Sequence, residues 1–336
     1  MKNALPLLAL LIGMSGAHAQ DKSVKPAAAA NETSYTLPDG RIALHGDEAL
    51  GPLIEALNAK FIETHAGSKF APQLKGSATA LPALAAGATA IGFVVGEATR
   101  PDLRAFKAIN KHDALSIKVG YAGYGPRADG KTPPAVYVNS ANPLAGLTMT
   151  QLAGLFTSGS PGGDINTWRQ LGVTGAWGTR RIHLYGQRDD GDFSTSLRLS
   201  RLGGMPFAGN YEGLADDAAV LQAVAQDPYG IAIVDWVDAK ASSDGVRIVP
   251  LASATGKPFV APDKAGVASG AYPLTPAITL YVAHPKKQLE PWIKDYLAMV
   301  LSDEGQAIVA RFTDGATGFL PLSADDRKTE REKLQN

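Results

Sequence analysis

In the first third of the chain, the spacing of apolar and polar residues predicts short strands, each followed by a helix. The first unit is a strand at Arg41–Leu44, a turn at 45–48 and a helix. That helix has its apolar residues on one face, at Leu50, Leu53, Ile54, Leu57 and Phe61. The order then repeats with a strand at 70–74, a turn at 75–79, a helix at 81–85 and a buried strand at 90–95. This alternation predicts an α/β lobe whose helix N-termini gather at one edge of the sheet, where a ligand would bind.

A second set of strands and helices follows from Ala135 onward. We expect a strand at 135–138, a helix capped by Thr148, a strand near 182–185, a helix ended by Gly203-Gly204, a helix at 218–225 and a strand at 230–234. The Gly-rich loop at 157–163 lacks the Gly-Lys-Ser/Thr ending of a nucleotide-binding loop, so it is interpreted as a connection. A strand at Tyr272–Val282 then leads to an amphipathic helix at 292–301.

The length of the chain and its N-terminus predict the domain organisation. A chain of 336 residues is longer than one compact core usually holds, so two lobes are expected. Lys2, the apolar run at 4–14 and the small residues Ala17-His18-Ala19 are typical of an export signal. The predicted parts are a signal peptide at 1–19, a flexible leader at 20–39, one lobe at 40–134 with 272–336, and a second lobe at 135–271.

Charge and cysteine content narrow the class of partner. The formal net charge is zero, which gives no electrostatic footprint for nucleic acid or an anionic membrane. The absence of cysteine excludes disulfides and a lipid-anchored N-terminal cysteine, and no later apolar stretch is long enough to span a membrane. With the export signal, we therefore expect a protein outside the cytoplasm, not embedded in the membrane, whose partner is a small solute.

The stretch from Tyr185 to Arg198 carries the clearest candidate chemistry. Arg188 ends a predicted strand, and Asp190, Asp192 and Ser194 stand at the start of the next helix. A guanidinium beside free helix N–H groups is suited to holding an oxyanion. The alternative interpretation is an ordinary helix cap beside a surface arginine, since caps favour the same residue types.

Several motifs, in the right order over residues 40–323, resemble the periplasmic phosphate-binding proteins of ABC uptake systems, which have the type II periplasmic binding-protein fold. The motifs that carry the resemblance are 46–53, 76–80, 98–101, 142–168, 188–194 and 302–309. The resemblance implies two α/β lobes joined by crossing strands, with a ligand cleft between them. It also implies a site at the turns after the strands, which we place at Asp47, Glu48, Ser77, Thr79, Thr99, Arg188, Asp190, Asp192 and Ser194.

Three acidic residues depart from the family's pattern at this site. Asp47 and Glu48 stand where the family has small or hydroxyl residues, and Asp192 replaces the serine of the signature. Carboxylates next to a phosphate dianion repel it. The hypothesis is that the cleft has lost tight phosphate binding or has moved to a less anionic or cationic solute, with Arg188 paired to Asp190 or Asp192.

Two functions remain open from the sequence. The first is a solute-binding protein that captures phosphate or a related small solute for an ABC permease, with no cofactor and no metal. The alternative is a binding-protein fold reused for adhesion, signalling or surface interaction. An enzyme is not expected, because the histidines are scattered without metal-ligand spacing and the chain has neither a Gly-x-Ser-x-Gly motif nor a cysteine.

Overall fold

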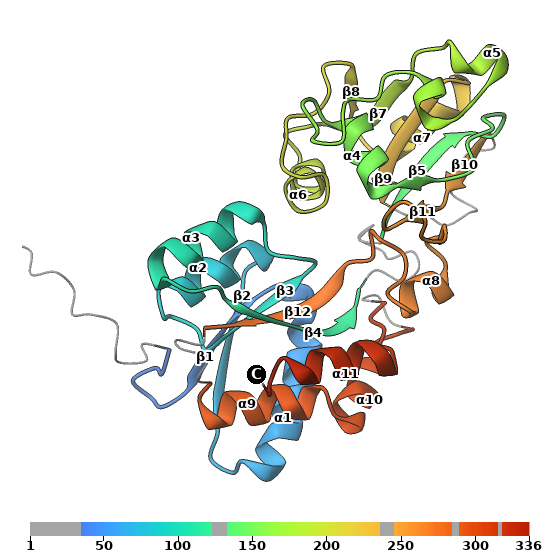
Figure 1. Ribbon diagram of the computed structural model, residues 1–336. Coiled ribbons are helices and arrows are strands. Elements are labelled where there is room, and N and C mark those ends of the chain that lie inside the picture. Colours follow the sequence, from blue (N-terminus) through green and yellow to red (C-terminus); the bar gives the residue numbers. More distant parts are fainter. Residues whose placement is uncertain (1–34, 123–132, 236–244, 284–288, 315–317, 336) are drawn as a thin grey trace, which may run out of the picture. The chain divides into compact units, whose positions relative to one another are not determined.

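A computed structural model describes residues 35–122, 133–235, 245–283, 289–314 and 318–335. Within these residues the fold consists of two five-stranded β-sheets and one two-stranded sheet, with helices packed on the large sheets (Figure 1). The signal peptide expected at 1–19 and the leader up to residue 34 lie outside the described residues. Tyr35, near the end of the expected leader, is buried, and its carbonyl accepts a hydrogen bond from the Ala43 N–H.

The first sheet combines parallel and antiparallel strands. Its order is β2 (Phe70–Leu74), β1 (Ile42–Gly46), β3 (Ile91–Val95), β12 (Ala277–Val282) and β4 (Leu115–Tyr121). β1 is parallel to both β2 and β3, whereas β12 is antiparallel to both β3 and β4. Since β1, β2 and β3 are parallel, the turns that follow them meet at the same edge of the sheet.

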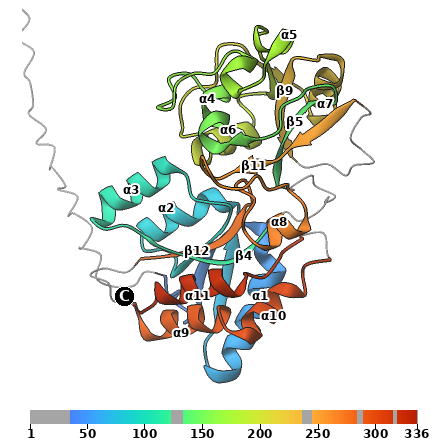
Figure 2. The ribbon, with the colours of Figure 1, turned by 45° about the vertical axis from the view of Figure 1, so that its right-hand side comes forward.

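Helices cover both faces of the first sheet (Figures 1 and 2). One face packs against α1 (Gly51–Thr64), α9 (Pro291–Val300) and α10 (Asp303–Ala310), and the other against α2 (Ala80–Ala85) and α3 (Arg100–Asn110). Along β12, Leu280 belongs to the first of these cores and Tyr281 to the second. Burial on both faces explains why β12 is apolar at nearly every position.

The C-terminal helix α11 (Ala324–Glu332) packs against β4 through polar contacts. The Tyr121 hydroxyl donates to Asp326 at 2.7 Å, and the Lys118 N–H donates to Glu330 at 3.0 Å. These contacts attach the C-terminal helix to the first sheet.

The second sheet repeats the mixed arrangement of the first. Its order is β10 (Val246–Val249), β5 (Pro134–Asn139), β9 (Gly230–Asp235), β7 (His183–Gln187) and β8 (Tyr211–Leu214). β7 is parallel to β8 and β9, and β5 is antiparallel to β9 and β10. The two-stranded sheet pairs β6 (Leu147–Thr148) with β11 (Leu251–Ala252).

Alternate residues of β5 enter two different cores. Tyr137 packs with Val220 and Val224 of α7 (Asp217–Gln226), and Val138 packs with the cluster that holds α4 (Met149–Phe156) and Leu197. Leu197 lies on α6 (Asp192–Ser200), so this core positions the helix that begins with the predicted signature. In the described residues this region also has α5 (Gly175–Gly178) and the 3₁₀ turn Trp168–Leu171, whereas Val267 of α8 (Lys264–Ala268) lies in the core of the first sheet.

The chain passes from the first sheet to the second between β4 and β5 and returns between β11 and β12. The returning strand expected at 272–282 is shorter than predicted, because only Ala277–Val282 pairs in the sheet. Pro273 and Pro276 precede it, and proline has no N–H to donate to a neighbouring strand. The α/β class expected from the sequence is confirmed; the lobe boundaries at 134/135 and 271/272 stay a prediction.

Candidate ligand-binding site

The turn after β1 is shaped by Gly46 and Asp47. A Cβ atom at Gly46 would lie 2.1 Å from the carbonyl oxygen of Phe93, so only glycine allows β1 and β3 to approach this closely. Asp47 is the N-cap of the 3₁₀ turn Glu48–Leu50, and its Oδ1 accepts a hydrogen bond from the Ala49 N–H at 2.9 Å. A carboxylate is favoured at this position because it satisfies an N–H that would otherwise have no partner.

The turn after β2 brings Ser77 to the same carboxylate. The Ser77 hydroxyl donates to Asp47 Oδ2 at 2.7 Å, and its oxygen accepts from the Val95 N–H at 3.0 Å. Gly76 precedes it at φ 98°, a left-handed conformation that L-residues rarely adopt. Both oxygens of Asp47 are thus occupied by donors from this edge of the sheet, one an amide and the other a hydroxyl.

Of three further predicted site residues on this side, two form local hydrogen bonds and the third is exposed. Thr99 caps α3: its oxygen accepts from the Asp102 N–H at 3.3 Å, and its hydroxyl donates to the Asp102 carboxylate at 2.5 Å. The Thr79 hydroxyl donates to the Gly76 carbonyl at 2.8 Å. Glu48 is exposed in the 3₁₀ turn.

The signature after β7 is also paired internally. Arg188 forms a two-pronged ion pair with Asp190, with both N–O distances 3.1 Å, and both side chains are about two-thirds exposed. The pair raises the pKa of the Arg188 guanidinium and lowers the pKa of the Asp190 carboxyl, in each case chiefly through these hydrogen bonds. Ser194 is buried, and its hydroxyl donates to the Gln187 carbonyl at 3.0 Å. The internal pairing expected for Arg188 is confirmed, and its partner is Asp190.

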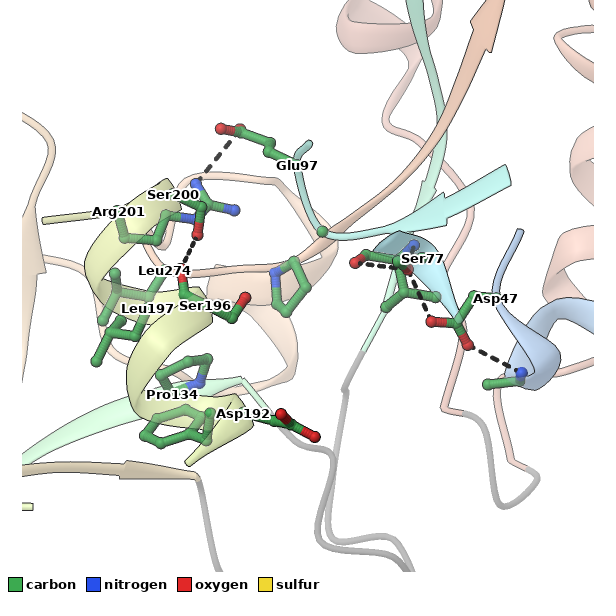
Figure 3. Close-up of a pocket in the computed structure, with 15 residues that line it drawn as sticks. Asp47, Ser77, Glu97, Pro134, Asp192, Ser196, Leu197, Ser200, Arg201 and Leu274 are labelled. Atoms are coloured by element: carbon green, nitrogen blue, oxygen red, sulfur yellow. Dashed lines mark hydrogen bonds and ion pairs between the residues drawn. The ribbon is translucent and has the colours of Figure 1, made fainter. Parts of the chain in front are cut away.

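A pocket of about 510 Å³ lies where β1, β2, β3 and α6 present these turns (Figure 3). In the close-up, Asp47 and Ser77 lie on one wall and Asp192 of α6 on the opposite wall. The residues that line it are Asp47, Ala49, Ser77, Val95, Gly96, Glu97, Pro134, Asp192, Phe193, Ser196, Leu197, Ser200, Arg201, Leu274 and Pro276.

Three of the nine predicted site residues therefore share this pocket. They are Asp47, Ser77 and Asp192, and the pocket's lining does not include Glu48, Thr79, Thr99, Arg188, Asp190 or Ser194. These six were predicted by carrying over motif positions. Five of these side chains instead form hydrogen bonds close to their own turns, and Glu48 is exposed, which a motif alignment does not reveal.

The sequence prediction placed Asp192 of α6 in the site and missed the rest of the pocket-facing side of this helix. Asp192, Ser196 and Ser200 recur every four residues, and Phe193, Leu197 and Arg201 follow the same interval one position later. Residues four apart lie on one face of a helix. This spacing was a signal that could have identified the pocket-facing side of α6.

Arg201 is the guanidinium in the pocket's lining, and its groups are already engaged. It forms an ion pair with Glu97 at 3.4 Å and donates to the carbonyls of Pro273 at 3.5 Å and Thr275 at 3.1 Å. Its side chain is 19% exposed. Arg201 thus joins the end of α6 to the turn after β3 and to the segment that leads into β12.

The electrostatic character of the pocket is acidic. Its lining contains three carboxylates and one guanidinium, and the guanidinium is paired with one of the carboxylates. In the part of the chain that the structure describes, no hydrogen bond or ion pair engages the Asp192 carboxylate. Among the same residues, no group of three or more His, Cys, Asp or Glu is placed to hold a metal ion, and no helix has the length and apolarity to cross a membrane.

Comparison with known families identifies the fold. Residues 25–304, which include most of both large sheets, match the PBP superfamily domain. The chain belongs to this PBP superfamily. The family expected from the sequence motifs is confirmed at this level.

Two relatives are similar to this PBP chain over most of its length. The chain is 27% identical over 289 residues to the phosphate-binding protein PstS of Pseudomonas aeruginosa, and the match covers 85% of this chain and 84% of that protein. It is 22% identical over 263 residues to the phosphate-binding protein PstS of Staphylococcus epidermidis, covering 78% and 74%.

Among solved structures, PstS from Borrelia burgdorferi is similar with a TM-score of 0.55 at 15% identity, over 84% of this chain and 98% of that one. At this identity the likeness shows the fold alone. It supports the assignment of this PBP chain to the two-lobed binding-protein architecture.

Proposed function

We propose that the protein is an exported, periplasmic solute-binding protein that holds a small solute in the pocket beside α6 and delivers it to an ABC permease. The observation that carries the proposal is the pocket itself. About 510 Å³ of space lies at the carboxyl ends of parallel strands and is bounded by polar side chains from the turns of the first sheet and from α6. Open α/β sheets bind ligands at this edge.

The sequence similarity of the chain to known proteins supports the same role. The matching relatives in Pseudomonas aeruginosa and Staphylococcus epidermidis are named phosphate-binding proteins. A protein of this type acts as a monomer that captures its solute and needs no cofactor. Phosphate, or a solute related to it, is the first ligand to test, and the lobes predicted at 40–134 with 272–336 and at 135–271 would enclose it.

A second function is favoured by the internal pairing of predicted site residues. The side chain of Arg188 is bound to Asp190, and that of Ser77 is bound to Asp47. If no solute binds at all, the fold is reused for adhesion, signalling or surface interaction. The two functions are separated by whether the pocket holds a solute.

The test is to purify the exported protein without denaturation, release its small molecules by unfolding, and identify them by mass spectrometry and a phosphate assay. The matched variants are Ser196→Trp, which places a large ring on the pocket face of α6, and Gln222→Trp, at an exposed position of α7 outside the pocket. We expect a solute to be released from the wild type and from Gln222→Trp, and much less from Ser196→Trp. Equal release from all three would place the solute elsewhere, and release from none would favour the reused fold.

A further inference from the structure

The donors that could hold an oxyanion on the β1 and β2 side of the pocket are already bound to a carboxylate. Asp47 accepts the Ala49 N–H at 2.9 Å and the Ser77 hydroxyl at 2.7 Å. A carboxylate in this position presents two oxygens to the donors, as a phosphate oxygen pair would. Asp47 is therefore a built-in anion, and a free anion would have to displace it.

The cations near the pocket are also occupied. Arg201 is paired with Glu97 and bonded to two backbone carbonyls, and Arg188 is paired with Asp190 outside the pocket's lining. An incoming dianion would thus meet no uncommitted guanidinium among the lining residues that the structure describes. It would also approach two acidic walls, those of Asp47 and Asp192.

The opposite wall carries a carboxylate that a ligand could satisfy. Asp192 lies on the first turn of α6 facing the pocket, and no interaction in the described part of the chain engages its side chain. The ring of Phe193 and the side chains of Leu197 and Leu274 add apolar surface around it. Carboxylate and apolar surface together complement an organic ammonium ion.

We infer that the pocket takes a small organic solute bearing an ammonium group, and that Asp47 sets this specificity by occupying the donors that phosphate would need. The inference rests on the proposed function of solute binding and names its substrate class. The ammonium ion bonds to Asp192 and faces the negative charge of Asp47 across the pocket, while the apolar body of the solute covers Phe193 and Leu197.

Calorimetric titration of the whole exported protein, unfolded and refolded to remove any bound solute, tests the inference. The probes are tyramine, putrescine, choline and inorganic phosphate. The variants are Asp192→Asn and, as a control with the same change of charge, Glu55→Gln, on an exposed position of α1 outside the pocket. We expect at least one amine to bind the wild type and Glu55→Gln, and to bind Asp192→Asn about tenfold or more weakly, as loss of a charge-assisted hydrogen bond requires.

The outcomes separate the inference from the proposed function. Phosphate binding more tightly than every amine overturns the inference and leaves solute binding intact. If no probe binds but the natively purified protein releases a solute without an ammonium group, the inference is again wrong and the proposed function stands. If no probe binds and no solute is released, both are wrong. An amine that binds Asp192→Asn as tightly as the wild type places the ammonium site elsewhere.

Discussion

Asp47 has two structural tasks at the end of β1. Its carboxylate caps the 3₁₀ turn through the Ala49 N–H and fixes the Ser77 side chain of the neighbouring turn. An N-cap needs only an acceptor oxygen, which serine also supplies. The negative charge of Asp47 therefore exceeds what the cap requires, and it is this charge that opposes an anion in the pocket.

Replacing Asp47 with serine is expected to strengthen phosphate binding. Asp47→Ser keeps an acceptor for the Ala49 N–H, frees the Ser77 hydroxyl and removes one negative charge from the pocket, so the affinity for phosphate should rise by about tenfold or more. Calorimetry at pH 8 measures it. Glu48→Ser is the control, because it makes the same change one residue away at a side chain outside the pocket's lining, and its effect should be smaller. Equal affinities for Asp47→Ser and the wild type would show that Asp47 does not exclude phosphate.

His45, two residues before Asp47, is expected to make stability depend on pH. Burial lowers the pKa of its imidazole, whose Nδ1 is buried without a hydrogen-bond partner in the described structure. The folded state thus favours the neutral ring, so its contribution is complete above the ordinary pKa of about 6.5 and is lost as the pH falls through the lower folded value. Urea unfolding at a series of pH values should show a smaller loss of unfolding free energy below pH 6.5 in His45→Gln than in the wild type. Parallel curves would mean that another group causes the loss.

At the scale of single elements, the close contact between β1 and β3 determines where the Asp47 turn lies. Gly46→Ala is expected to lower the free energy of unfolding by about 2 kcal/mol or more, because the added Cβ would overlap the Phe93 carbonyl and overpacking is costly. Gly51→Ala is the matched control: Gly51 has helical dihedrals and its added Cβ would make only an ordinary contact with Leu74, so no loss is expected. Chemical denaturation of both variants checks this. A stable Gly46→Ala would mean that the two strands can separate without cost.

The C-terminal end of α6 depends on Arg201. Arg201→Ala should lower the free energy of unfolding by about 2 to 3 kcal/mol, because it removes charged hydrogen bonds to the Pro273 and Thr275 carbonyls. Arg188→Ala is the comparison, since its ion pair is exposed and should contribute little to stability. Thermal or urea unfolding distinguishes the two. Equal, small losses would show that α6 is held without Arg201.

Much of the element order could be predicted from the sequence, because the apolar spacing of α1, α4, α7 and α9 and the apolar runs of β3 and β9 carry clear periods. The turns after β1 and β2 were also correctly expected to meet, since parallel strands end at one edge. The internal pairing of Arg188 could be predicted, because acidic residues two and four positions away offer local partners; that Arg188 lies outside the pocket's lining could not. The role of Arg201 was hidden because its partners lie about 70 to 100 residues away in sequence and are mostly backbone carbonyls.

At the scale of the whole molecule, membership in the PBP superfamily explains the two mixed sheets and the place of the pocket, whereas it leaves the solute open. The relatives' name for their ligand and the charges of this pocket point to different solutes. In this chain Asp47 occupies the Ala49 N–H and the Ser77 hydroxyl, and in the described residues no partner engages the carboxylate of Asp192. The fold and the ligand specificity are therefore separate properties of this molecule.

The most direct test is a calorimetric titration of inorganic phosphate into the wild-type protein, unfolded and refolded to remove bound solute, at pH 8 and pH 5. Because the carboxylates of Asp47 and Asp192 line the pocket and phosphate is a dianion at pH 8, we predict a dissociation constant weaker than about 1 mM, an affinity below that of a specific site. Any binding that emerges only at pH 5 would follow protonation of the phosphate dianion. Micromolar or tighter binding at pH 8 would contradict the assignment of Asp47 as a built-in anion.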